Sequence, residues 1–142
     1  MIQLKPNAAI AYKMLGVVYS QYQEMNKAEE AYKKAINLEP KSVLFHIALG
    51  NFYYAQEKFD LAIPQYLGVI SIDANHMEAH LLLGYAFTKL KKFDDADYYF
   101  HKALGKNPDD PKVLEGVNYF YRMTNQKDTM LTVKEMTENQ RQ

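Results

Sequence analysis

The 142-residue sequence predicts an all-α fold, built as an array of stacked helix pairs. Three glycines, Gly16, Gly50 and Gly84, stand thirty-four residues apart, and many other positions recur at the same step without an insertion. Within each unit the apolar residues are spaced three and four apart, which places them on one face of a helix. A period in this range is typical of repeat arrays, whose units bury a continuous core between neighbours.

Each unit carries two amphipathic stretches, and each stretch has its own recurring positions. Around the glycine of the first stretch these positions are Tyr12, His46 and His80, then Leu15, Leu49 and Leu83, and then Tyr19, Tyr53 and Phe87. In the second stretch they are Ala28, Ala62 and Ala96, then Tyr32, Tyr66 and Phe100, and then Ala35, Val69 and Ala103. A glycine inside a helix costs about 0.5–1 kcal/mol relative to alanine. Its recurrence therefore predicts a close contact where the backbones of the two paired helices approach.

The units follow one another in order. Residues 1–8 match the end of a second helix, because Met1–Pro6 aligns with Ala35–Pro40, and we expect an array that was cut from a longer one. Complete units are expected at 9–42, 43–76 and 77–110. A degenerate fourth unit is expected at 111–142, where Asn118 stands in place of the glycine, and it would cap one continuous domain.

Residues that favour helix starts recur in the same period, because a short polar side chain can accept a hydrogen bond from a free backbone N–H group. Candidate N-caps of the second helices are Asn26, Asp60, Asp94 and Asp128. Candidate N-caps of the first helices are Asn7, Ser42, Asn75 and Asp110. Pro111 is well suited to a first helical position.

These columns resemble the tetratricopeptide repeat. That family's pattern of an aromatic, Leu-Gly and an aromatic, followed by Ala, an aromatic, Ala and Pro, is matched by Tyr12, Leu15, Gly16, Tyr19, Ala28, Tyr32, Ala35 and Pro40. The resemblance covers residues 9–110 and weakens beyond them. It implies a right-handed superhelical array, or α-solenoid, whose first helices line a concave groove. It also implies a scaffold for protein–protein interaction rather than an enzyme.

Composition sets limits on the partner. The 17 basic and 17 acidic residues balance, so no excess positive charge is present to attract nucleic acid or an anionic membrane surface. No apolar stretch is long enough to cross a bilayer, so we expect no membrane insertion by this segment. The absence of cysteine suits a reducing compartment such as the cytoplasm without requiring one.

The histidines are the candidates for chemistry. His76 and His80 are four residues apart, a spacing that can place two imidazoles on one helical face for a metal. The alternative, which we favour, is that His80 is a packed and hydrogen-bonded member of the aromatic column. His101 is expected on the surface without an acidic partner at helical spacing. We therefore expect no catalytic residue, no metal and no cofactor.

The resemblance implies which residues face the concave groove. Those expected to contact a partner are Ile10, Lys13, Val17, Leu44, Ile47, Asn51, Tyr54, Leu81, Tyr85, Thr88, Tyr119 and Arg122. The same face includes Gln21, Glu78, Lys112 and Glu115. Many of these side chains are apolar or tyrosine, and an exposed strip of that kind marks an interaction site. The alternative is that packing within the array buries part of the strip.

One ligand of such grooves is disfavoured. The resemblance points to the acidic C-terminal peptide of Hsp70 and Hsp90 chaperones, which a clamp of lysines, asparagines and an arginine holds. The matching positions here are Lys13, Val17, Ala48, Glu78 and Leu82. Only the lysine is kept, and Glu78 would repel a carboxylate.

Three functions remain open from the sequence. The chain binds a peptide or helical segment of a partner protein, or it assembles with further copies of itself as a homo-oligomer, or it is the regulatory arm of a larger enzyme. The identity of a protein partner is not encoded in the repeat pattern.

Overall fold

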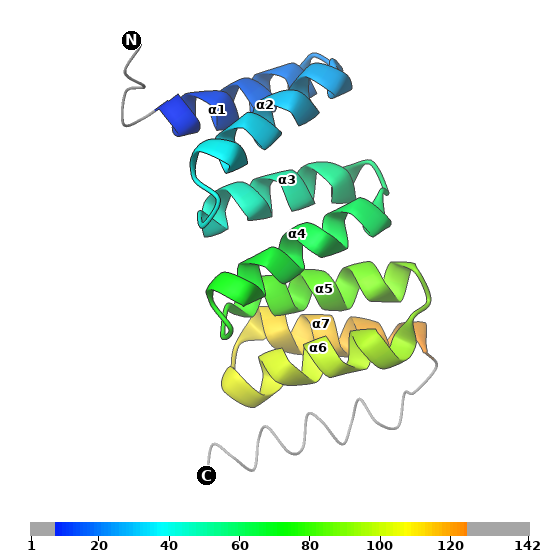
Figure 1. The fold of residues 1–142 in the computed structure, drawn as a ribbon. Helices are drawn as coiled ribbons and strands as arrows, with labels where there is room; N and C mark the ends of the chain where they lie inside the picture. Colours follow the sequence, from blue (N-terminus) through cyan, green and yellow to red (C-terminus); the bar gives the residue numbers. More distant parts are fainter. Residues whose placement is uncertain (1–7, 125–142) are drawn as a thin grey trace. The chain divides into compact units, whose positions relative to one another are not determined.

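The computed structural model describes residues 8–124, which form two compact units divided after Asp73. The helices of the first unit are α1 (Ala8–Gln21), α2 (Met25–Leu38), α3 (Val43–Ala55) and α4 (Phe59–Ile72) (Figure 1). Those of the second unit are α5 (Met77–Lys89), α6 (Phe93–Lys106) and α7 (Pro111–Met123). No strand occurs between residues 8 and 124, and the expected all-α class is confirmed.

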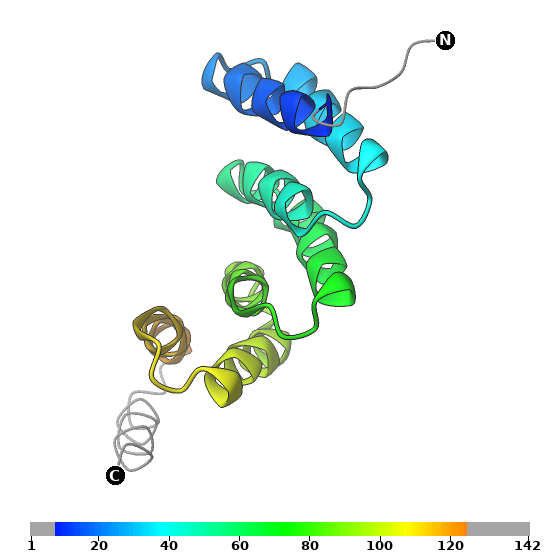
Figure 2. The ribbon, with the colours of Figure 1, turned by 90° about the vertical axis from the view of Figure 1, so that its left-hand side faces the viewer.

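Successive helices pack as pairs inside each unit. In the first unit α1 packs on α2 and α3 on α4, while α2 also contacts α3. In the second unit α5 packs on α6, and α7 contacts both of them. Figure 2 shows, for each unit separately, that the first helices lie on one side and the second helices on the other. This arrangement brings α1 beside α3, and α5 beside α7.

The recurring columns form most of the core. The second-helix residues are buried, and they are Ala28, Ala62, Ala96, Tyr32, Tyr66, Phe100, Ala35, Val69 and Ala103. The leucine column is uneven, because Leu49 and Leu83 are 1% and 0% exposed whereas Leu15 is 43% exposed. The periodic pattern therefore predicted the core of α2 to α6 well and overestimated the burial of α1.

The glycines make room for an aromatic ring. A Cβ atom built on Gly50 would lie 2.5 Å from Cε1 of Tyr66, and one on Gly84 would lie 2.7 Å from Cζ of Phe100. Real Cβ atoms essentially never approach other heavy atoms so closely. The expected close contact is therefore present, but its partner is the ring of the second helix and not that helix's backbone. The sequence interpretation was wrong on this point.

The turn inside each helix pair has the same geometry three times. Gln23, Glu57 and Lys91 adopt left-handed conformations with φ of 63°, 59° and 59°. The amide of the next residue donates to a carbonyl five residues earlier, as from Glu24 N to Tyr19 O at 2.9 Å. This is the Schellman arrangement that ends many helices, in which the left-handed position is usually glycine.

This turn corrects the N-caps expected for the second helices. The N-cap residues are Glu24, Lys58 and Lys92, and none of their side chains caps the helix. The second helix starts immediately after the Schellman turn, so Asp60 and Asp94 fall inside the first turn instead of before it. Carboxylates there are still stabilising, because they lie near the positive end of the helix dipole. Asn26 likewise lies within α2, and Asp128 is outside the described residues.

The first helices agree better with the expected caps. Ser42 accepts a hydrogen bond from the amide of Phe45, and Asp110 accepts one from the amide of Lys112 at 2.8 Å. Asn75 was wrong, because the N-cap of α5 is His76, whose Nδ1 accepts from the amide of Ala79 at 3.2 Å. Asn7 lies outside the described residues.

We expect Glu57→Gly to stabilise the protein by about 0.5–1 kcal/mol. A non-glycine residue in the left-handed region is strained by roughly 1–2 kcal/mol, and relief of that strain exceeds the added backbone entropy of glycine. Urea unfolding monitored by circular dichroism measures the difference. Glu57→Ala is the matched control, since it removes the carboxylate and keeps the Cβ atom. An equal gain in both variants would contradict the backbone explanation.

Candidate functional site

A pocket of about 440 Å³ lies between α5 and α7 in the second unit. Its lining from α5 is Met77, Glu78, Leu81, Leu82 and Tyr85, and its lining from α7 is Lys112 and Glu115. Four of these residues are apolar or aromatic, whereas the other three carry charge. The pocket is thus an apolar depression bordered by two carboxylates and one ammonium group.

Tyr85 is the central aromatic of this site. Its ring packs edge-on against Phe100, with centroids 5.3 Å apart, and lies 5.1 Å from the ring of Tyr119. Burial raises the pKa of the Tyr85 phenol, and the carboxylate of Glu115 acts in the same direction, while Arg122 opposes them. The hydroxyl is therefore neutral at physiological pH and can donate or accept a hydrogen bond.

The residues of the second unit that were expected to contact a partner differ in their location and in their exposure. Tyr85 lines the pocket and Tyr119 packs beside it, and the ammonium of Lys89 lies 5.8 Å above the Tyr119 ring. Arg122 is exposed. Leu81 is only 6% exposed, although it lines the pocket.

Thr88 is 3% exposed and donates its hydroxyl to the carbonyl of Gly84 at 2.7 Å. The expectation that its side chain faces a partner is corrected, because a buried hydroxyl bonded within its own helix offers no surface. Two pocket residues, Met77 and Leu82, were not among those expected. Met77 directly precedes the predicted groove residue Glu78, and Leu82 directly follows the predicted groove residue Leu81.

The first unit presents the remaining expected residues on α1 and α3. Ile10, Leu44 and Asn51 are exposed, and the half-buried ones are Lys13, Val17, Ile47 and Tyr54. Asn51 has a structural contact as well, because its side-chain oxygen accepts a hydrogen bond from the hydroxyl of the buried Tyr66 at 2.7 Å. The strip in this unit is therefore only partly exposed.

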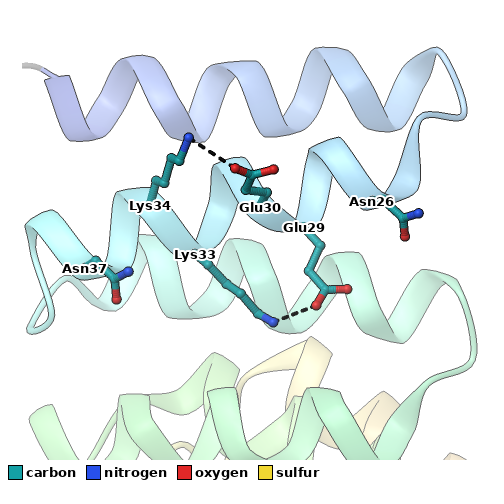
Figure 3. Close-up of a pocket in the computed structure, with 6 residues that line it drawn as sticks. All are labelled: Asn26, Glu29, Glu30, Lys33, Lys34 and Asn37. Carbon is teal, nitrogen blue, oxygen red and sulfur yellow. Dashed lines mark hydrogen bonds and ion pairs between the residues drawn. The ribbon is translucent and has the colours of Figure 1, made fainter.

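A second hollow, of about 420 Å³, lies on α2, and the residues that line it are polar or charged (Figure 3). It is lined by Asn26, Glu29, Glu30, Lys33, Lys34 and Asn37. Its charges pair along the helix, from Lys33 to Glu29 at 2.6 Å and from Lys34 to Glu30 at 3.2 Å. A single helix supplies every lining residue and the charges already pair with each other, so this hollow is a solvated helix face.

His46 and His80 are each hydrogen-bonded to a backbone carbonyl that precedes their own helix. Nε2 of His46 lies 2.7 Å from the carbonyl of Pro40, and Nε2 of His80 lies 2.8 Å from that of Ala74. A carbonyl only accepts, so each ring donates through Nε2. The interpretation of His80 as a packed, hydrogen-bonded imidazole is confirmed. Among residues 8–124 no group of three or more His, Asp or Glu side chains is placed to hold a metal ion.

His101 has partners that the sequence analysis missed. Its Nδ1 lies 3.0 Å from a carboxylate oxygen of Asp97, four residues earlier in α6, and its Nε2 lies 3.0 Å from the hydroxyl of Tyr121 in α7. The expectation of no acidic partner at helical spacing was wrong. The chain of three side chains links α6 to α7 and is therefore part of the packing of the second unit.

Family models decide the identity of the repeats. Models of the tetratricopeptide repeat match residues 9–42 and residues 47–111, which together make up more than half of the chain. The chain belongs to the tetratricopeptide repeat family. Tetratricopeptide repeat proteins bind protein or peptide partners, and membership supports a protein-interaction scaffold of a typically non-enzymatic kind.

Solved tetratricopeptide repeat structures share the fold. MamA of AMB-1 is 23% identical, with a TM-score of 0.72, over 95% of this chain and 75% of that one. The first repeat domain of Spaghetti (RPAP3), bound to the HSP90 peptide SRMEEVD, is 17% identical, with a TM-score of 0.72, over 90% of this chain and 99% of that one. A tetratricopeptide repeat protein from Parabacteroides merdae is 17% identical, with a TM-score of 0.81, over 96% of this chain and 53% of that one.

These identities establish the fold alone. A comparison with curated protein sequences gives no match. None of the helices between residues 8 and 124 is long and apolar enough to cross a membrane.

Proposed function

We propose that this tetratricopeptide repeat chain holds a segment of a partner protein in the pocket between α5 and α7. The observation that carries the proposal is the pocket itself, an apolar depression of about 440 Å³ with charged residues at its border. Burial of an apolar side chain from the partner in such a depression supplies affinity, while the surrounding polar groups select its neighbours.

The charges favour one class of segment. Neither Glu78 nor Glu115 forms an ion pair with another described residue. Two unpaired carboxylates favour a lysine or arginine beside the buried apolar residue, and they disfavour an acidic peptide such as the one bound to Spaghetti. Lys112 weakens this preference without cancelling it, because the lining carries two negative groups and one positive group.

In the first unit, taken by itself, the side chains proposed to contact a protein partner are the exposed or half-buried members of the predicted strip, Ile10, Lys13, Val17, Leu44, Ile47, Asn51 and Tyr54. In the second unit, the residues proposed to contact a partner at the pocket and beside it are Leu81, Tyr85, Tyr119 and Arg122. Tyrosine suits such a surface, because it offers a large contact area at a small entropy cost.

Selection from a displayed library of random peptides tests the proposal. Peptides recovered on the full chain are expected to share a large apolar residue with a lysine or arginine nearby. Their binding, measured by fluorescence anisotropy, is expected to fall at least tenfold in Leu82→Asp, because a third carboxylate then occupies the apolar floor.

Leu61→Asp is the matched control, since Leu61 is an exposed leucine of α4 that does not line the pocket. Its affinity for the same peptides is expected to equal that of the parent chain. Peptides that lose affinity equally in both variants, or an unchanged affinity in Leu82→Asp, would contradict the pocket as the binding site.

A further inference from the structure

The charged side chains of α5 and α7 are divided by sign along the two helices. Glu78 and Glu115 lie toward the N-terminal ends of these helices and line the pocket. Lys89 and Arg122 lie in the last turns of the same helices, and both side chains are exposed. Neither cation forms an ion pair with another described residue.

Contacts between α5 and α7 show that the acidic and cationic side chains belong to one surface. Met77 and Lys112, from the first turns of the two helices, line one pocket. Further along, the rings of Tyr85 and Tyr119 pack with their centroids 5.1 Å apart. The two helices therefore run in the same direction. Lys89 continues this surface, because its ammonium lies 5.8 Å from the centroid of the Tyr119 ring.

The hydroxyl of Tyr85 lies between the two kinds of charge. Burial raises the pKa of this phenol most, the charge of Glu115 raises it further, and the charge of Arg122 lowers it. Arg122 is three residues after Tyr119, which places both on one side of α7. The surface thus passes from carboxylates, over apolar and aromatic side chains, to two cations.

We propose that Lys89, Tyr119 and Arg122 form a subsite for a carboxylate side chain of the bound segment. The subsite rests on the proposed function, because it acts on a segment that the pocket already holds. A lysine or arginine of that segment lies near Glu78 and Glu115, a large apolar residue fills the pocket, and an aspartate or glutamate reaches the two cations. A segment with two charges of one sign meets repulsion at one end of the surface.

The helices set the separation of the two charges in the bound segment. Glu78 and Lys89 are eleven residues apart in α5, and Glu115 and Arg122 are seven residues apart in α7. At about 1.5 Å per residue these separations correspond to roughly 10–17 Å. An extended segment covers about 3.3 Å per residue, so its opposite charges are expected roughly three to five residues apart.

This subsite differs from the clamp that holds chaperone tails. In α5 the positions that match the clamp are Glu78 and Leu82, and both line the pocket. Lys89 lies in the last turn of the helix instead. The carboxylate is therefore bound at the end of the surface where the clamp has no counterpart in α5.

Fluorescence anisotropy of the full chain with three labelled peptides tests the subsite. The Lys/Glu peptide is Gly-Gly-Lys-Ala-Leu-Ala-Glu-Gly-Gly, blocked at both termini, and the Lys/Gln and Lys/Lys peptides replace its glutamate. The Lys/Glu peptide is expected to bind about threefold more tightly than the Lys/Gln peptide, as an exposed ion pair allows. The Lys/Lys peptide is expected to bind more weakly still.

Charge reversal on the protein tests which residues hold the carboxylate. Lys89→Glu with Arg122→Glu is expected to invert the order, so that the Lys/Lys peptide binds more tightly than the Lys/Glu peptide. The neutral variant Arg122→Gln is expected to reduce the preference without inverting it. Lys102→Glu is the matched control, because the Lys102 ammonium also lies over an exposed tyrosine, 5.4 Å from the ring of Tyr98 in α6. It is expected to keep the original order.

The outcomes separate this subsite from the pocket. Binding that Leu82→Asp abolishes, with the preference for the Lys/Glu peptide unchanged in the double glutamate variant, would overturn the subsite and leave the pocket in place. An equal loss of the preference in Lys102→Glu would also overturn the subsite. Peptides that do not bind, or that bind equally well to Leu82→Asp, would overturn the pocket and the subsite together.

Discussion

Phe100→Ala is expected to destabilise the second unit by about 3–5 kcal/mol, the range for truncating a buried aromatic side chain. Phe100 is 0% exposed and its ring contacts those of Tyr85 and Phe120, with centroids 5.3 and 5.8 Å apart. It also fills the space over Gly84 and Gly116, where added Cβ atoms would lie 2.7 and 2.9 Å from it. One ring therefore connects all three helices of the unit.

Guanidinium chloride unfolding monitored by circular dichroism measures this loss. Phe93→Ala is the matched control, because Phe93 also lies in α6 but is 36% exposed. Its cost is expected to be much smaller. Equal costs for the two variants would show that the ring of Phe100 does not organise the unit. Because Tyr85 packs on Phe100, peptide binding in the proposed pocket is expected to be lost together with stability.

Gly50→Leu is expected to destabilise the first unit by about 1–3 kcal/mol through overpacking. The first added atom would already lie 2.5 Å from Tyr66, which is 0% exposed. The helix pair α3–α4 must separate, or the ring must leave its rotamer. Urea unfolding of the variant and of the parent chain gives the difference.

Two further variants isolate the contact between Gly50 and Tyr66. Gly105→Ala places a methyl group in α6 where no atom lies within 4 Å, and it is expected to stabilise by up to about 0.5–1 kcal/mol through helix propensity alone. Gly50→Leu combined with Tyr66→Ala is expected to cost less than the sum of the two single changes, because the leucine then occupies the space of the ring. Strict additivity would mean that the two residues do not interact.

The sequence predicted most of the fold, because the buried positions recur every thirty-four residues and carry similar residue types each time. Residues such as Ala62 and Phe100 have counterparts at the same place in each repeat, because the two helices of every pair pack in the same way. The N-caps of the second helices were predicted two residues too late. The reason is that Gln23, Glu57 and Lys91 adopt the left-handed conformation of the turn, which is usually indicated by a glycine in the sequence. No side chain at those positions signals the turn.

The candidate site was less predictable. Groove positions carried over from the family include five residues of the pocket, Glu78, Leu81, Tyr85, Lys112 and Glu115. They assume, however, that every first helix has the same environment. Leu81 is buried in a cluster with residues of α7, and the hydroxyl of Thr88 donates a hydrogen bond within α5. The link from His101 to Tyr121 joins residues twenty positions apart, a distance that no helical spacing detects.

The contact between each glycine and its ring also bears on how the chain folds. Gly16 and Tyr32, Gly50 and Tyr66, and Gly84 and Phe100 are each only sixteen residues apart in sequence. Proteins whose contacts are local fold quickly, because little chain entropy is lost before the first contacts form. The contact between each glycine and its ring can therefore form early, within its own hairpin, before that hairpin packs against its neighbours.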